Sequence, residues 1–284
     1  MLKTNKNILV VNDDGIEAIG IHKLAEALSD AGNVYVCSPH MQQSATGHGI
    51  TIGRPVYLED VPLKEAKQAI SVEGSPADCV KIGLELFRSR GVEMDMVFSG
   101  FNHGHNLGTD TLYSGTVAAA IEGALNGLPS AAMSISQIET NHTVPKHFET
   151  AMGLAVKIAN SGLFSGQSYN GSKPMDVSFI NNDHVILNVN IPDFPTEKIM
   201  GIKVCPLSYR AYENEVRLKE NDEGYIYGSY AGWPRIIGNI SANESDIIAN
   251  SLGYVTITPL HFDLSNHEMI NTIYSEWDTG GNHS

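Results

Sequence analysis

The sequence predicts one α/β domain built on a doubly wound, mostly parallel sheet of the Rossmann-like kind. Short apolar runs alternate with segments of helical periodicity, and polar loops follow the apolar runs. The runs are continuous rather than alternating, which is typical of parallel strands covered on both faces. With 284 residues, 42% of them hydrophobic, the chain is long enough for one large core. We therefore expect residues 1–284 to form a single domain.

The amino terminus predicts a strand, a helix and a second strand in succession. Residues 8–11 form a short apolar run, and residues 34–37 form another. Between them, Ile21, Leu24 and Leu28 share one face of a helix. Parallel strands need a crossover connection of this kind, so the unit predicts a parallel pair.

The same alternation continues to residue 192. The expected strands are 69–72, 94–98, 131–135 and 185–191, and the expected helices follow Ser75, follow Ser114 and span 147–160. Ser75 is a favoured N-cap residue, and Pro76 is a favoured first helical residue. The helix after Ser114 is apolar on almost every side, so we expect it to be buried.

The pattern changes after Pro192. Residues 202–240 contain many aromatic residues together with Gly and Pro, and they predict a β-hairpin excursion, or arm, outside the main sheet. A helix at 245–252 and a strand at 254–258 are expected to follow as a C-terminal extension.

Charge and cysteine content exclude several classes of protein. The formal net charge is −14, which disfavours binding to nucleic-acid polymers or to anionic membranes. No run of 18 apolar residues is present, so we expect no membrane span, and the first seven residues lack the apolar region of a secretory signal. Three widely spaced cysteines suit a reducing compartment. We therefore expect a cytoplasmic protein.

Two adjacent carboxylates, Asp13 and Asp14, end the first predicted strand. Ligands of open α/β sheets bind beyond the carboxyl ends of the strands, where Ser44 and the loop at 99–113 are also expected. Carboxylate, hydroxyl and amide oxygens form a hard donor set, which suits Mg²⁺, Mn²⁺ or Ca²⁺ rather than zinc. The alternative is a simple turn in which an Asp caps the following helix.

The loop at 99–113 is rich in glycine and amides and leads into the buried helix. Its glycines allow a close backbone approach to a ligand, and Asn102 and Asn106 supply amide groups. The stretch Ser114, Gly115 and Thr116 opens the helix, whose free N–H groups would bind a phosphate. The alternative is an ordinary long loop followed by a capped helix. Neither the dinucleotide-binding nor the P-loop glycine spacing is present.

These segments resemble the SurE survival-protein family, whose members are metal-dependent nucleoside-monophosphate phosphatases. The resemblance rests on NDDG at residues 12–15, on VEGSPADCVKIGL at 72–84, on the stretch from SGFNHGHNLG to YSGTVAAAIEG at 99–123, and on GYVTITPLHFDLSNH at 253–267. It implies one divalent ion per subunit, Mg²⁺ or Mn²⁺. The implied metal ligands are Asp13, Asp14, Ser44 and Asn102, the two aspartates being catalytic, and the implied phosphate ligands are Asn106, Ser114, Gly115 and Thr116.

The same resemblance implies a homodimer or homotetramer with exchanged C-terminal elements, for which the arm at 202–240 is a candidate. Asp263 and His267 match a family Asp-x₃-His pattern, and their role, active-site support or hinge, stays open. His103 and His105 stand where family members usually carry small residues, and their roles also stay open.

The resulting hypothesis is hydrolysis of nucleoside 5′- or 3′-monophosphates by metal-assisted attack of water, without a phosphoenzyme. The sequence has no Gly-x-Ser-x-Gly elbow, which disfavours a covalent serine mechanism. Two alternatives remain at this point: a non-catalytic nucleotide-binding module, and an aspartyl-phosphate phosphatase or receiver-like switch. The second would need an Asp nucleophile with a lysine partner at a later strand end.

Overall fold

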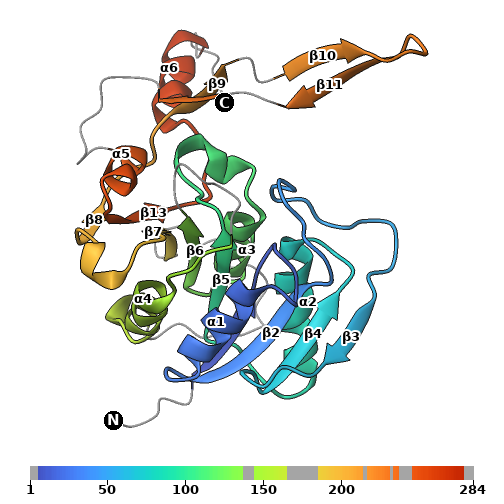
Figure 1. Cartoon of the computed structure of the whole chain (residues 1–284), viewed down its shortest axis with the longest axis vertical. Helices are drawn as coiled ribbons and strands as arrows, with labels where there is room; N and C mark the ends of the chain where they lie inside the picture. Colours follow the sequence, from blue (N-terminus) through green and yellow to red (C-terminus); the bar gives the residue numbers. More distant parts are fainter. Residues whose placement is uncertain are drawn as a thin grey trace, which may run out of the picture.

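The computed structural model describes residues 6–136, 144–164, 185–213, 216–230, 233–236 and 245–277. Its centre is a nine-stranded sheet with the strand order β3-β4-β2-β1-β5-β6-β7-β13-β8 (Figure 1). The strands of this sheet are β1 (Asn7–Val11), β2 (Asn33–Pro39), β3 (Leu58–Val61), β4 (Gln68–Val72), β5 (Met96–His103), β6 (Ser130–Ser136), β7 (Ile186–Pro192), β8 (Ile202–Val204) and β13 (Val255–Leu260). The helices are α1 (Ile19–Leu28), α2 (Pro76–Ser89), α3 (Gly115–Leu125), α4 (Glu149–Ala159), α5 (Asp246–Ser251) and α6 (His267–Trp277).

The predicted doubly wound, mostly parallel sheet is confirmed. Strands β4, β2, β1, β5, β6 and β7 run parallel, whereas β3 and β13 pair antiparallel with β4 and β7. The chain builds outward from β1 through β2 to β4 and then returns to place β5 on the other side of β1. Strand order therefore reverses between β1 and β5, and the carboxyl ends of these two strands form the expected ligand edge.

Helices cover both faces of the sheet (Figure 1). Along β1, successive side chains point to opposite faces because a strand has a period of two. Ile8 and Val10 pack into the cluster that contains Leu24 of α1. Leu9 and Val11 pack into the cluster that contains Val80 of α2 and Ala119 of α3. This two-sided burial explains the continuous apolar run.

Serine N-caps fix the starts of α2 and α3 where the sequence predicts them. The Ser75 hydroxyl accepts the N–H of Asp78 at 3.1 Å, and the Asp78 carboxylate accepts the N–H of Ser75 at 2.9 Å. These reciprocal bonds are a capping box. At the start of α3, the Ser114 hydroxyl accepts the N–H of Val117 at 3.1 Å.

The predicted boundary between the strand at 94–98 and the loop at 99–113 is wrong. Strand β5 continues to His103, with an irregularity between Gly100 and Asn102 in its pairing with β6. Gly100 has a φ of +134°, and a Cβ there would lie 2.2 Å from the Met133 carbonyl oxygen. Glycine therefore lets the strand continue past the point where its apolar run stops. The sequence analysis also missed β3, an edge strand with mostly exposed residues.

The C-terminal third adds to the sheet and then leaves it. Strand β8 pairs parallel with β13, so the excursion starts after residue 204 rather than at residue 202. Beyond it, β9 (Arg210–Glu213) pairs with β12 (Trp233–Ile236), and β10 (Val216–Glu220) pairs with β11 (Ile226–Tyr230). Residues 214–215, 231–232 and 237–240 of the predicted excursion lie outside the described residues.

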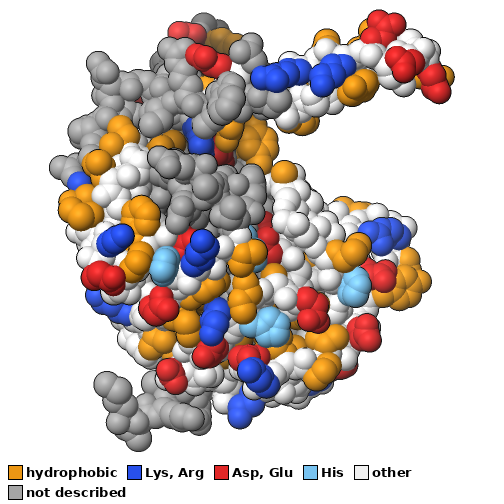
Figure 2. All heavy atoms as spheres, viewed as in Figure 1, with side chains coloured by type: hydrophobic (Ala, Val, Ile, Leu, Met, Phe, Trp, Pro, Cys, Tyr) orange, Lys and Arg blue, Asp and Glu red, His pale blue; other side chains and the backbone are white. Residues whose placement is uncertain are grey.

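The β10–β11 hairpin extends away from the α/β body (Figures 1 and 2). Its apolar side chains are exposed, with Leu218 and Ile226 each 72% accessible. Helix α6 likewise contains no buried residue. Within the part of the chain that the structure describes, no helix has the length and apolar character needed to cross a membrane.

Candidate active site

The carboxylate of Asp13 lies against the first turn of α3. Asp13 follows β1 and is only 6% exposed. Its Oδ1 accepts the hydroxyl of Thr116 at 2.7 Å, and its Oδ2 accepts the backbone N–H of Thr116 at 3.2 Å. The end of the first strand and the start of the buried helix are thus joined through one carboxylate.

Burial and a neighbouring charge change the acidity of Asp13. Burial, followed by the charge of Asp14, raises the pKa of Asp13 to about 7, although the hydrogen bonds from Thr116 act in the opposite direction. The surroundings therefore do not fully compensate two ionised carboxylates near neutral pH. A divalent cation beside the two carboxylates would supply that compensation.

Asp14 connects β1 with the end of β5. Its Oδ2 accepts the backbone N–H of His103 at 2.9 Å, and its Oδ1 accepts the side-chain amide of Gln42 at 3.4 Å. The Nδ1 atom of His103 lies 3.9 Å from the same Oδ2. Asp14 is therefore oriented by Gln42, in the loop after β2, and by the backbone of His103, at the end of β5. The His103 imidazole lies beside it.

The other two predicted metal ligands are on the chain segments that meet at these acids. Asn102 directly precedes His103, and its Nδ2 donates to the Gly104 carbonyl at 2.9 Å, which fixes the orientation of its amide. In the loop after β2, the Gln43 N–H donates to the Asp13 carbonyl at 2.7 Å, and the exposed Ser44 is the next residue. The structure brings both segments to the acids without showing a direct contact from either side chain to a carboxylate.

The donor set fits a hard divalent cation. Two carboxylates lie beside segments that offer an amide and a hydroxyl oxygen, which are the ligand types preferred by Mg²⁺ and Mn²⁺. Among the described residues, no group of three or more His, Cys, Asp or Glu side chains is arranged to hold a metal.

The predicted phosphate residues approach the acids from α3. Gly115 packs so closely that a Cβ there would lie 3.0 Å from the Asp13 Cβ and 3.0 Å from Pro76. Ser114 caps the helix, and Thr116 contacts Asp13 directly. The first turn of α3 therefore packs directly against Asp13 and leaves little room for a side chain at position 115.

Asn106 is held by side chains of β6 and β7. Its N–H donates to the Asn190 side chain at 2.7 Å, and its carbonyl accepts the side-chain amides of Asn188 and Asn190 at 2.8 and 3.0 Å. Its own Nδ2 donates to the Ser134 hydroxyl at 2.9 Å. These contacts fix the position of Asn106, but no direct contact with the α3 turn is seen among them.

Several residues of this network escaped the sequence analysis. Asn188 and Asn190 are buried, and their i, i+2 spacing in an otherwise apolar strand is a signal that could have identified them. Asn12 is also fully buried, and it donates to the Gly15 carbonyl at 2.8 Å. Arg210 and Asp246 offered no local signal, because their partners Asp110 and Gly108 lie 100 and 138 positions away in the chain.

Asp263 and His267 lie on an exposed segment at the start of α6, where their side chains pair with each other. The Oδ2–Nε2 distance is 3.0 Å. Hydrogen bonds from Ser265, followed by the one from His267, hold the pKa of the Asp263 carboxyl well below its usual range. The pair spans the turn into α6, and its role stays open.

Comparison with known proteins identifies the family. The family model described as survival protein SurE matches residues 8–214, which include both aspartates, the glycine loop and the start of α3. The chain belongs to the SurE family. A 5′-nucleotidase SurE from Heliobacterium modesticaldum is 38% identical over 277 residues, covering 96% of this chain and 92% of that relative. A 5′-nucleotidase SurE from Clostridium botulinum is 37% identical over 270 residues, covering 94% of this chain and 98% of the relative.

A solved SurE structure has the same fold. The crystal structure of the SurE protein from Aquifex aeolicus superposes with a TM-score of 0.74 at 33% sequence identity, covering 95% of this chain and 99% of that chain. The similarity to SurE proteins therefore extends over nearly the whole chain, including the C-terminal region beyond residue 214.

Proposed function

We propose that the chain is a divalent-metal-dependent phosphatase that hydrolyses nucleoside monophosphates, of the 5′-nucleotidase type. One observation carries this proposal: the buried Asp13 lies between Asp14 and the first turn of α3, so a hard-cation site and an anion site adjoin. The names of the related SurE proteins support the same activity.

We propose that Asp13, Asp14, Asn102 and Ser44 hold one Mg²⁺ or Mn²⁺ ion per subunit. Bound there, such an ion supplies charge neutralisation at the phosphate and a more acidic water. Ser44 is exposed in the loop that follows β2. The anchoring of its neighbour Gln43 to the Asp13 carbonyl keeps that loop at the site.

The remaining residues bind and orient the phosphate. Ser114, Gly115 and Thr116 would offer the positive end of the α3 dipole, and Asn106 would offer its side-chain amide. We propose that Asp13 or Asp14 also accepts a proton from the attacking water. The attacking group in this proposal is water, so no phosphoenzyme is formed.

A hydrolysis assay with Asp14→Asn tests the proposal. Wild-type protein, freed of metal by chelator, is assayed on nucleoside 5′- and 3′-monophosphates with and without added Mg²⁺ or Mn²⁺. We expect metal-dependent release of phosphate, reduced at least about a hundredfold in the variant, because the loss of one ligand removes electrostatic stabilisation of the transition state.

The exposed Asp30, in the turn after α1, provides a matched control as Asp30→Asn, which should keep full activity. Near wild-type turnover of Asp14→Asn at saturating metal would overturn the proposed metal role. A wild-type protein that binds nucleotide but releases no phosphate with any of these ions would identify a non-catalytic binding module instead.

We further propose a homodimer or homotetramer joined through the arm and α6. Their exposed apolar side chains support this, with Tyr230 85% and Trp277 77% accessible. Light scattering after size exclusion measures the mass, and Leu218→Glu should reduce it to that of a monomer; an unchanged mass would exclude the hairpin as interface.

We also propose a cytoplasmic location. The free, buried Cys37, Cys79 and Cys205 support it, because a reducing compartment keeps thiols unpaired.

A further inference from the structure

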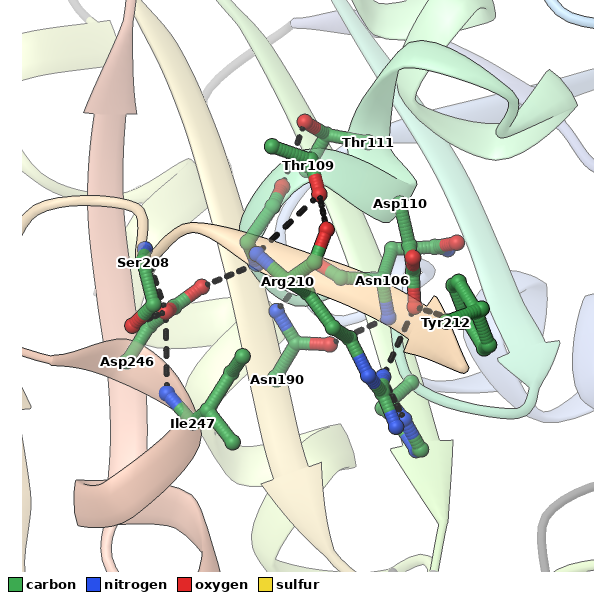
Figure 3. A network of polar contacts seen from close by, with 12 residues as sticks. Asn106, Thr109, Asp110, Thr111, Asn190, Ser208, Arg210, Tyr212, Asp246 and Ile247 are labelled. Atoms are coloured by element: carbon green, nitrogen blue, oxygen red, sulfur yellow. Dashed lines mark hydrogen bonds and ion pairs between the residues drawn. The ribbon is translucent and has the colours of Figure 1, made fainter. Parts of the chain in front are cut away.

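The segment that carries Asn106 is held from outside by residues of the C-terminal third. The side chain of Arg210, at the start of β9, is only 9% exposed. Its Nη1 atom lies 2.7 Å from the Asp110 Oδ2 and 2.7 Å from the His105 Nε2 (Figure 3). The Tyr212 hydroxyl donates to the same Asp110 oxygen at 2.8 Å. One guanidinium therefore connects the residue before Asn106 with a residue four positions after it.

Backbone contacts attach the same two stretches to each other. The Thr109 hydroxyl donates to the Arg210 carbonyl at 2.6 Å and accepts the Arg210 N–H at 3.3 Å. The buried Asp246 carboxylate accepts the Gly108 N–H at 2.7 Å and the Ser208 N–H at 2.9 Å (Figure 3). Gly108 has a φ of +55°, and a Cβ there would lie 2.6 Å from the Ser208 carbonyl oxygen. Glycine is therefore required for the two chains to approach so closely.

Asn106 is consequently fixed from two directions. Asn190 of β7 and Ser134 of β6 bind it from the sheet side, as described above. Arg210 fixes its flanking residues from the arm side. Because Arg210 donates to the His105 Nε2, the neutral imidazole must carry its proton on Nδ1. Both contacts come from Nη1, whose two hydrogens can reach two acceptors at once.

We propose that Arg210 is a positioning residue for phosphate binding, acting through His105 and Asp110 to hold Asn106 in its working place. This proposal rests on the function proposed above, because it takes Asn106 to be a phosphate ligand. Arg210 itself needs no contact with the substrate. Its loss is expected to weaken the binding of phosphate while the metal site, built from β1 and the end of β5, keeps its affinity.

The test compares Arg210→Met and Arg210→Lys with wild type in the full-length protein. Three quantities are measured: the dissociation constant for inorganic phosphate in the presence of Mg²⁺, the affinity for Mn²⁺ alone, and kcat and KM for a nucleoside 5′-monophosphate. For Arg210→Met we expect the phosphate dissociation constant and KM to rise about 10- to 100-fold, the range found when supporting groups are removed. Arg210→Lys should recover part of the loss, and Mn²⁺ affinity should stay at the wild-type value.

Arg90 provides the matched control, because it also forms an ion pair with an aspartate. Its Nη1 and Nη2 atoms lie 2.8 and 3.0 Å from the carboxylate of Asp60, on the exposed surface away from this loop. Arg90→Met should leave all three quantities unchanged. A double variant of Arg210→Met with Asp110→Asn should lose no more than the larger of the two single losses, because both act through one contact.

Unchanged phosphate affinity in Arg210→Met would overturn the proposal, as would an equal loss of Mn²⁺ affinity, which would indicate a general collapse of the site. If Arg210→Met does not fold, Asp110→Asn and Tyr212→Phe carry the same test, and wild-type phosphate affinity in both would overturn it. Wild-type protein that binds no phosphate would overturn it as well. If wild type binds phosphate more tightly than Arg210→Met but hydrolyses no nucleotide, the positioning role stands and the proposed enzymatic function fails.

Discussion

The hydroxyl of Thr116 donates to the Asp13 Oδ1 at 2.7 Å, across a boundary between the first strand and the third helix. We predict that Thr116→Val lowers kcat/KM about tenfold or more, because a hydrogen bond to a charged group contributes about 1.5–3 kcal/mol. Steady-state kinetics at saturating Mg²⁺ measures the effect. Thr116→Ser retains the hydroxyl and should retain most activity; equal losses in the two variants would mean that the methyl group, not the hydroxyl, matters.

The raised pKa of Asp13 predicts a pH-dependent stability of the metal-free protein. The pKa is about 7 in the folded protein, against 3.8 for an unperturbed aspartate, so the fold holds the proton more tightly than the unfolded chain does. This contribution to the free energy of unfolding is fully present below pH 3.8 and is lost as the pH rises through 7. In chelator, wild type should lose on the order of 4 kcal/mol between pH 4 and pH 8 relative to Asp13→Asn.

Urea denaturation of the two proteins at a series of pH values measures this difference. Added Mg²⁺ should restore stability to wild type above pH 7, but not to Asp13→Asn, because only the ionised carboxylate binds the cation strongly. Curves that stay parallel from pH 4 to pH 8 would show that Asp13 titrates normally in the folded protein.

The close packing of Gly115 predicts that a larger residue there has a steric effect confined to the site. A Cβ at this position would lie 3.1 Å from the Asp13 Oδ2, so Gly115→Ala should displace the carboxylate and reduce kcat/KM about tenfold to a hundredfold. Gly153, in α4, has open space around its Cβ position. Gly153→Ala should therefore keep full activity and gain about 0.5–1 kcal/mol of stability. Activity and thermal melting of both variants test the contrast, which fails if Gly115→Ala is as active as wild type.

The ion pairs of Glu122 predict an effect on stability. Its carboxylate is 2% exposed and lies 2.9 Å from the His48 Nε2 and 2.6 Å from the Lys81 Nζ. Burial acts to raise the pKa of Glu122, but the hydrogen bonds from His48 and Lys81 outweigh it, so the net pKa lies below its usual value. The stabilisation is therefore present above pH 4.5 and is lost as the pH falls through the lowered pKa.

We expect Glu122→Gln to lower the free energy of unfolding at pH 7 by about 1–2 kcal/mol, because it weakens the hydrogen bonds that the buried carboxylate accepts from the partly exposed His48 and Lys81. The exposed Glu85, paired with Arg88 on the surface of α2, is the matched control. Glu85→Gln should change stability by less than about 0.5 kcal/mol. Denaturation at pH 7 and pH 4 distinguishes the two, and the prediction fails if both variants unfold at the same urea concentration.

The sequence was sufficient for the elements whose signals are local. Continuous apolar runs located β1 and β2, and serine caps located the starts of α2 and α3, because burial on two faces and capping both leave a short pattern in the chain. The end of β5 could not be found in this way. Gly100 and Asn102 weaken the strand pattern, and only pairing with β6 keeps the strand going.

The same division applies to the candidate site. Asp13 and Asp14 were identified because carboxylates directly after a buried strand are unusual, whereas Arg210 is one of several basic residues in a polar segment. Its partners at positions 105 and 110 become neighbours only after β7, β8 and β9 have been assembled. Contacts between segments so distant in the chain leave no local pattern to detect.

The order of synthesis gives these contacts a further consequence. Asp13, Asp14 and the start of α3 belong to the first 116 residues, whereas Ser208, Arg210 and Asp246 leave the ribosome much later. A nascent chain thus completes its acidic pair well before the residues that cover the glycine loop exist. Until those residues emerge, the carboxylate of Asp246 and the guanidinium of Arg210 cannot restrain the loop, so the loop of an incomplete chain lacks these contacts.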